Sequence, residues 1–207
     1  FNQETILGLI NNGMDVARIN MSHYDENIGL DKHIRFIREQ TKKINRNVAI
    51  LFDLGGPKIR VGKVDSGTIK IKKGSHYTLG GTNCDIPLNK KLSFDSYTSG
   101  GEVKVNDGNL SFDIVEVGNN TLKLLAHNSG EISSGKGVNF PGVKLDLPSL
   151  TEKDKIDLQL AVELGADWLA MSFVRSANDY SIINKELERL GASIPVIAKI
   201  EKPEAID

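Results

Sequence analysis

The chain has 207 residues, which is enough for one or two domains with hydrophobic cores of their own. Charged residues make up 26% and the formal net charge is −1, so no basic surface indicates a nucleic-acid partner. No apolar run is long enough to cross a membrane, and the single cysteine, Cys84, cannot form an internal disulfide. We therefore expect a cytoplasmic protein. Because the chain starts without methionine inside a predicted helix, we also expect it to be a piece of a longer protein.

The N-terminal part alternates predicted helices with short predicted strands. Apolar residues at helical spacing predict a helix over residues 3–12, ending near Gly13, and a strand over residues 15–20 follows. A second amphipathic pattern predicts a helix over residues 30–44, which leads into a strand over residues 48–53.

The middle of the chain has a different pattern. Most of the 20 glycines lie between residues 62 and 142, where no helical stripe is sustained. Short β-like runs occur at residues 68–71, 102–105, 110–117 and 121–125, separated by turn signals at 107–108 and 118–120. These features predict a small all-β domain.

The last part of the chain again alternates predicted helices with predicted strands. Thr151 is expected to cap a helix with Asp154 in the capping-box position, and a strand over residues 167–173 follows. The expected apolar stripe of that helix consists of Ile156, Leu160, Ala161 and Leu164. A further helix over residues 176–190 precedes a strand that begins at Val196.

Helices that alternate with short buried strands indicate a parallel sheet, and connections this short favour a (β/α) barrel. We predict an α/β fold, a (β/α)8 TIM-type barrel that is incomplete in this chain, with an inserted small all-β barrel domain. The expected boundaries are residues 1–62 and 143–207 for the barrel and 63–142 for the insertion. Inserted after a barrel strand, the small domain is expected to form a lid over the active face.

Polar side chains stand at the ends of the predicted strands. One side of the first strand carries Arg18, Asn20 and, if the strand persists that far, Ser22. A guanidinium forms bidentate hydrogen bonds with phosphate or carboxylate oxygens. On the last strand Lys199 and Glu201 share a face, which suits an anionic substrate held on a divalent ion. A surface salt bridge is the alternative interpretation of this last pair.

The second strand ends in a carboxylate, Asp53, followed by two glycines, Pro57 and the cations Lys58 and Arg60. The glycines let the backbone come close to a ligand, and Pro57 stiffens the turn. By itself this segment also fits an ordinary loop.

Taken together, six segments resemble the signature of the pyruvate kinase family and come in that family's order. They are residues 16–23 (Val-Ala-Arg-Ile-Asn-Met-Ser-His), 52–60 (Phe-Asp-Leu-Gly-Gly-Pro-Lys-Ile-Arg), 136–142 (Lys-Gly-Val-Asn-Phe-Pro-Gly), 150–154 (Leu-Thr-Glu-Lys-Asp), 171–175 (Met-Ser-Phe-Val-Arg) and 198–201 (Ala-Lys-Ile-Glu). The resemblance covers essentially the whole chain. Pyruvate kinases transfer the phosphoryl group of phosphoenolpyruvate to ADP, giving pyruvate and ATP, so these would be the substrates.

The resemblance implies a role for each matching residue. Arg18 looks like the arginine that binds the substrate phosphate, and Arg60 like a second catalytic cation on the transferring group and the nucleotide. Lys199 matches the lysine that binds substrate and stabilises charge in the transition state. Glu201 matches a ligand of the divalent metal, Mg²⁺ or Mn²⁺.

The remaining implied roles concern the monovalent cation and the nucleotide. Asn20, Ser22 and Asp53, with Leu54 beside them, match the potassium site, and Ser172 matches a position next to it and to the substrate. The nucleotide side is matched by His23, Asp107 and Lys136, the last two from the lid.

The chain departs from the family pattern in two ways. Potassium-dependent members usually read Asp-Thr-Lys-Gly-Pro-Glu at residues 53–58; Leu54 and Lys58 resemble the potassium-independent branch, whereas Gly55 fits neither. We therefore expect Lys58 to replace K⁺. The family's other metal carboxylate, its proton-donor threonine and its regulatory domain would lie beyond Asp207, in what is expected to be a homotetramer.

Two other functions are considered. A metal-dependent lyase or aldolase acting on phosphoenolpyruvate or pyruvate would also use a carboxylate-bound metal and an arginine, but it has no nucleotide for a lid to cover. An inactive phosphoenolpyruvate sensor would be expected to lose Lys199 or Glu201. We expect Trp168 to lie in the core, and Cys84 to be an inert thiol.

Overall fold

The computed structural model describes residues 2–24, 27, 29–143, 147–201 and 205–206. The chain divides into two compact units, Phe1–Pro57 with Pro148–Asp207 (the first unit) and Lys58–Leu147 (the second unit). In sequence, the second unit therefore interrupts the first, and its limits lie a few residues outside the expected 63 and 142.

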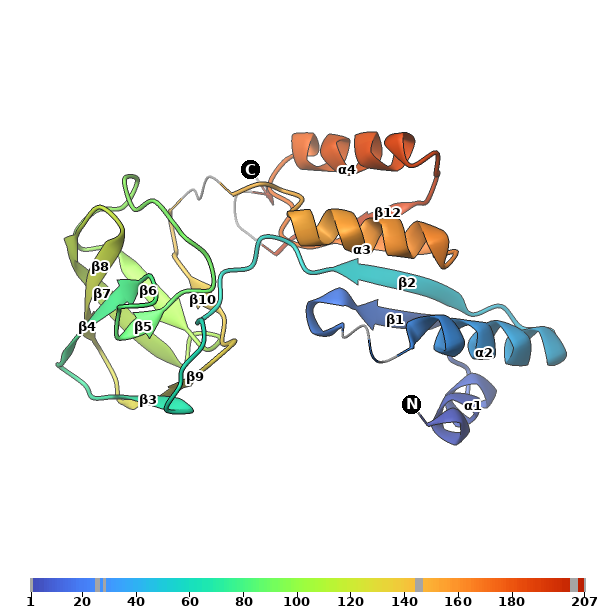
Figure 1. Cartoon of the computed structure of the whole chain (residues 1–207), viewed down its shortest axis with the longest axis horizontal. Coiled ribbons are helices and arrows are strands. Elements are labelled where there is room, and N and C mark those ends of the chain that lie inside the picture. Colours follow the sequence, from blue (N-terminus) through green and yellow to red (C-terminus); the bar gives the residue numbers. More distant parts are fainter. Residues whose placement is uncertain (1, 25–26, 28, 144–146, 202–204, 207) are drawn as a thin grey trace. The chain divides into compact units, whose positions relative to one another are not determined.

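The first unit contains a four-stranded parallel sheet in the order β1-β2-β11-β12 (Figure 1). Its strands are β1 (Val16–Asn20), β2 (Ala49–Leu54), β11 (Trp168–Met171) and β12 (Val196–Ala198). The helices of this unit are α1 (Gln3–Asn11), α2 (Leu30–Lys43), α3 (Glu152–Glu163) and α4 (Ala177–Arg189), with a 3₁₀ turn η1 (Met21–His23) after β1. The strands of this sheet lie side by side in the order in which they occur along the chain, which is typical of an α/β barrel. The prediction of an α/β fold is therefore confirmed at the level of the fold class.

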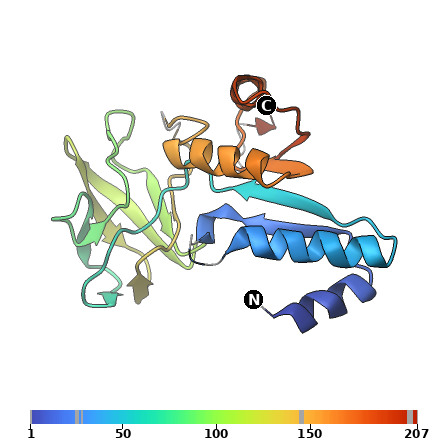
Figure 2. The same ribbon diagram turned by 45° about the vertical axis from the view of Figure 1, so that its right-hand side comes forward.

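The core of the first unit lies on one face of the sheet. Ile50, Phe52 and Leu54 of β2 are fully buried there, in one cluster with residues of α2, α3 and α4. Because side chains alternate along a strand, Asp53 is on the opposite face of β2. The helices are visible alongside the strands in Figure 2. None of the described helices is long and apolar enough to span a membrane.

Helix α3 begins as predicted, and its buried face includes part of the predicted stripe, since Ala161 is buried and Leu160 and Leu164 pack against the core. Thr151 caps it, and Asp154 completes the capping box. The predicted stripe is wrong at Ile156, which is 69% exposed, whereas Leu158 and Asp157 are buried. Beside Leu158 and Ala161, the face turned inward carries the carboxylates of Asp154 and Asp157, which a search for apolar spacing does not find.

The strand that follows α3 also differs from its prediction. It ends at Met171 rather than at residue 173, and Phe173 has a φ of 59°, outside the extended region. Trp168, which was expected in the core, is 42% exposed. Its side chain lies on the same face of the sheet as that of Leu51, with which it is in register.

The described part of the second unit contains strands and no α-helix. The strands are β3 (Thr68–Ile71), β4 (His76–Gly80), β5 (Ile86–Pro87), β6 (Glu102–Val105), β7 (Leu110–Val117), β8 (Thr121–Ala126), β9 (Gly130–Ser133) and β10 (Val138–Asn139). Six of them form a sheet in the order β10-β6-β7-β8-β4-β5, and β3 pairs with β9. The four predicted strands are present, while β4, β5, β9 and β10 were not predicted; β5 and β10 have only two residues each.

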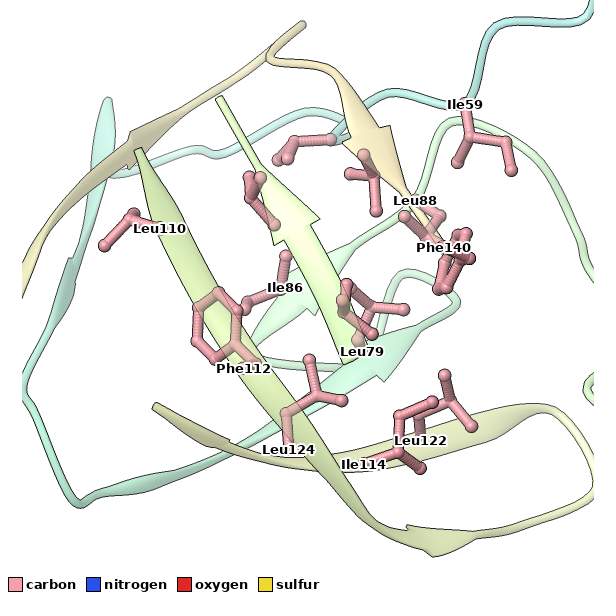
Figure 3. Packing of buried hydrophobic residues seen from close by; sticks show 14 of the residues in the cluster. Ile59, Leu79, Ile86, Leu88, Leu110, Phe112, Ile114, Leu122, Leu124 and Phe140 are labelled. Atoms are coloured by element: carbon pink, nitrogen blue, oxygen red, sulfur yellow. The ribbon is translucent and has the colours of Figure 1, made fainter. Parts of the chain in front are cut away.

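The second unit has a core of its own (Figure 3). Phe112 and Ile114 of β7 and Leu122 and Leu124 of β8 are fully buried at its centre. The hairpin between β6 and β7 turns at residues 106–108, all of which have positive φ. Such left-handed backbone is unfavourable for residues other than glycine, so packing and hydrogen bonds must hold it.

Arg175 and Asp179 form a largely buried ion pair at the N-terminal end of α4. The Asp179 carboxylate accepts hydrogen bonds from the Ser149 hydroxyl and, at 2.8 Å, from the Arg175 backbone N–H. Burial opposes ionisation of Asp179, but the hydrogen bonds from Ser149 and Arg175 outweigh it and lower the pKa of Asp179. Because the folded-state pKa lies below the unfolded one, this contribution to stability is present above the unfolded pKa and is lost as the pH falls through the folded value.

We predict that Asp179→Asn lowers the free energy of unfolding at neutral pH and flattens its fall below about pH 4. The measurement is urea unfolding against pH, followed by helical circular dichroism. Asp31→Asn is the matched control, since Asp31 has the same spacing to Arg35 but is partly exposed, so solvent screens the pair. An equal effect of both changes would contradict the prediction.

Candidate active site

Polar side chains on β1 and β2, and directly after β11 and β12, meet around one buried carboxylate, that of Asp53. Asp53 is only 2% exposed. Arg18 donates from Nε to Asp53 Oδ2 at 2.7 Å, and its Nη2 lies 2.5 Å from the same oxygen. Lys199 Nζ lies 3.1 Å from Oδ1 and 3.3 Å from Oδ2. The structure therefore brings together two of the three residues that the sequence predicted to be cations of the active site; the third, Arg60, belongs to the second unit.

Burial of a lone carboxylate is costly, and the two cations offset that cost. Arg18 keeps 54% of its side chain exposed and Lys199 keeps 28%. Both therefore retain N–H donors that Asp53 does not use, since a guanidinium has five and an ammonium three. The sequence assigned Asp53 to a monovalent-cation site, and it did not predict this ion pairing.

Ser172 links the ends of three strands. Its hydroxyl donates to the Leu54 carbonyl oxygen at 2.6 Å and accepts from Lys199 Nζ at 2.9 Å. Its oxygen also lies 3.3 Å from Asp53 Oδ1. Ser172, which is itself buried, thus holds Lys199 by a hydrogen bond.

The loop after β2 comes very close to the loop after β11. At Gly56, whose φ is +67°, a Cβ atom would lie 3.1 Å from both the Cβ and the carbonyl oxygen of Ser172. Only glycine fits this combination of backbone angle and space.

Glu201 follows β12 and contacts Lys199, with Oε1 3.5 Å from Nζ. Its other oxygen, Oε2, accepts a hydrogen bond from the Phe173 backbone N–H at 3.1 Å. The side chain is about one-third exposed, and its oxygens are hard donors of the kind that Mg²⁺ prefers. Among the described residues no three His, Cys, Asp or Glu side chains form a metal-binding group, so Glu201 would need ligands from elsewhere.

The turn after β1 corrects one prediction. The strand does not persist to Ser22, because β1 ends at Asn20 and residues 21–23 form the 3₁₀ turn η1. Asn20 Oδ1 accepts from the Ser22 backbone N–H at 3.1 Å and so caps this turn. Ser22 and His23 are both exposed on η1 and lie outside the alternation of the strand.

The other predicted residues belong to the second unit, where three of them surround Gly137. A Cβ atom at Gly137 would lie 3.9 Å from Lys58 Nζ and 4.0 Å from Asp107 Oδ1. Arg60 pairs with Gly137 in an antiparallel bridge and donates from Nη1 to the Gly135 carbonyl oxygen at 2.9 Å. Lys136, next in sequence, is exposed. Three cations and one carboxylate are therefore neighbours within this unit.

Comparison with known proteins gives a consistent result. The chain matches the family described as pyruvate kinase, barrel domain, over residues 1–207. A pyruvate kinase of Corynebacterium glutamicum is 37% identical over 206 residues, which cover 97% of this chain and 43% of that protein. Pyruvate kinase 2 of Synechocystis sp. is 40% identical over 215 residues, covering 99% and 36% of the two chains.

A pyruvate kinase of Mycobacterium tuberculosis is 36% identical over 211 residues, covering 99% of this chain and 44% of that protein. The chain thus spans less than half the length of these relatives. The family match extends over the same residues that carry the Asp53 cluster and Glu201. The chain therefore belongs to the pyruvate kinase family.

Proposed function

We propose that the full-length protein is a phosphotransferase that moves the phosphoryl group of phosphoenolpyruvate to ADP. The observation that supports this most is the pair of cations, Arg18 and Lys199, held on the buried carboxylate of Asp53, with the Arg18 side chain 54% exposed. Phosphoryl transfer requires accurate positioning and dispersed positive charge more than covalent help from the protein.

The two cations have different roles in this proposal. Arg18 is the more exposed and has the planar fork that matches phosphate oxygens, so it binds the phosphoryl group of the substrate. Lys199 is the more enclosed and is fixed by Ser172, so it stabilises the negative charge that develops on the enolate oxygen as the phosphoryl group leaves.

Glu201 supplies a carboxylate for a divalent ion. Mg²⁺ in phosphoryl-transfer sites is commonly held by one or two carboxylates together with substrate oxygens, and one glutamate with a free lone pair fits that pattern. When bound, the ion would neutralise negative charge on the substrate. The Phe173 N–H fixes the orientation of the glutamate.

The nucleotide is assigned to the second unit and to His23. Asp107 stands in a left-handed turn, and Lys136 and Arg60 carry positive charge beside Gly137. A strained turn that presents a polar side chain is often functional, and positive groups suit the phosphates of ADP.

The first prediction concerns Lys199→Met, which should lower the turnover number of the full-length enzyme by about 10²–10³. The KM for phosphoenolpyruvate should change little, because the charge that Lys199 stabilises develops only in the transition state. The measurement is a coupled lactate dehydrogenase assay. Lys185→Met, an exposed lysine of α4, is the control, and a Lys199→Met enzyme with more than half of the control's turnover would refute the role.

A second prediction concerns Lys136→Ala. Losing this cation should weaken the apparent affinity for ADP more than the affinity for phosphoenolpyruvate, because the proposal places Lys136 on the nucleotide side. Initial rates with each substrate varied in turn give both values. Lys123→Ala, which removes an exposed lysine of β8, should affect neither, and equal losses for both substrates in Lys136→Ala would contradict the assignment.

A third prediction is that the enzyme does not require potassium. By the resemblance to the pyruvate kinase family, Lys58 takes the position of the glutamate of potassium-dependent members, and a fixed ammonium would both supply the charge and repel a second cation. Activity in tetramethylammonium buffer should therefore change less than about twofold when KCl replaces that salt at constant ionic strength.

Lys58→Glu should create potassium activation. Lys63→Glu makes the same change of charge at an exposed lysine and serves as the control. Strong potassium activation of the unaltered enzyme would show that Lys58 does not replace the ion.

A further inference from the structure

The N-terminal turn of α3 contacts both loops that carry the Asp53 cluster and its neighbours. This turn is Thr151 to Asp154, and it lies in the first unit with β1, β2 and η1. A capping box accounts for the bonds between Thr151 and Asp154, but two further contacts reach outside the helix.

The first contact holds the loop after β2. Asp154 Oδ2 accepts from the Thr151 backbone N–H at 2.9 Å and from its hydroxyl at 2.6 Å, which completes the cap. The other oxygen, Oδ1, accepts from the Gly56 backbone N–H at 3.0 Å. Asp154 is 1% exposed, so both of its oxygens are used within the protein. Gly56 lies three residues after Asp53, and its N–H therefore fixes the loop that extends from the buried carboxylate.

The second contact holds the turn after β1. Lys153 Nζ donates to the Met21 carbonyl oxygen at 3.0 Å and to Asp157 Oδ2 at 2.5 Å. Asp157 is 3% exposed, and its burial raises the pKa of its carboxyl group even though Lys153 lowers it. Asp157 thus aims the ammonium of Lys153 at the backbone of η1.

The two loops are also packed against each other. A Cβ atom at Gly55 would lie 3.0 Å from Ser22 Oγ and 3.9 Å from Asp154 Oδ1. Ser22, Gly55 and the α3 turn therefore meet at one place. A displacement of η1 or of the Gly55–Gly56 loop would move the residues at the ends of β1 and β2, because Asn20 caps η1 and Asp53 precedes the glycines.

We propose that Lys153 and Asp154 are positioning residues that hold η1 and the Gly55–Gly56 loop in place, and through them Asn20, Ser22 and Asp53. This inference rests on the proposed phosphoryl transfer for its kinetic consequence. Neither residue is assigned any contact with substrate, metal or nucleotide. The sequence revealed only the capping role of Asp154, and nothing in the pattern distinguished Lys153 from its neighbour Lys155.

The test compares two changes of lysine to methionine on the same helix in the full-length protein. Lys153→Met is combined with Asp157→Asn so that no unpaired carboxylate is left buried. Lys155→Met is the matched control, since Lys155 pairs with the exposed Glu152 and contacts neither loop. We expect the double variant to lose about tenfold or more in kcat/KM, mainly through a higher KM for phosphoenolpyruvate with the KM for ADP unchanged.

A purely structural role would instead lower the fraction of folded enzyme, which reduces kcat and leaves KM unchanged. Amide hydrogen exchange gives a readout that does not depend on activity. Exchange should be faster at Ser22 in the double variant and at Gly56 in Asp154→Ala, and unchanged at both in Lys155→Met. Lys153→Arg keeps a cation between Asp157 and the Met21 carbonyl oxygen, and it should restore both exchange and KM.

Each outcome of these experiments either supports or contradicts the positioning role. Unchanged exchange at Ser22 in the double variant, or at Gly56 in Asp154→Ala, overturns the inference, whether or not the enzyme is active. If the double variant does not fold, a folded Lys153→Arg enzyme with fast exchange and a raised KM also overturns it. If the unaltered protein transfers no phosphoryl group, the proposed function fails, while the exchange comparison still tests the positioning role.

Discussion

The first unit is organised around the need to neutralise one buried carboxylate. Asp53 lies on the face of β2 opposite to the apolar core, at 2% exposure. A buried carboxylate is tolerated only when charged or hydrogen-bonding groups surround it. Asp53 has three such groups, which are Arg18 on β1, Ser172 directly after β11 and Lys199 directly after β12. One charge therefore connects the ends of four neighbouring strands.

The same arrangement prepares the site for an anion. The cations are oriented before any ligand arrives, because Asp53 fixes Arg18, while Ser172 and Glu201 fix Lys199. Such preorganised charge is more effective than mobile side chains, since no reorganisation is needed when negative charge develops. The close approach of Gly56 to Ser172 brings the loops near enough for this network to form.

Polar residues also decide how α3 packs. Asp154 and Asp157 are both buried on it, and each has a hydrogen-bonded partner. Buried polar groups with satisfied hydrogen bonds fix one arrangement of neighbouring elements, because any slip would leave a group unpaired. The second unit is different, since its centre is a continuous apolar cluster built on β7 and β8.

The sequence by itself determined the family and many of the local elements. The helices, their caps and the turn at residues 106–108 depend on neighbours a few positions away, so periodicity and turn chemistry predict them. The order of the six segments indicated the family, and the resemblance led to the roles proposed for individual residues. Only the tertiary structure decided that Asp53 pairs with Arg18 and Lys199, which are 35 and 146 positions away. It also decided that Ser22 leaves the strand, and that α3 buries Asp157 rather than Ile156. These features depend on partners brought together by folding, and no local pattern records which distant group will satisfy a buried charge.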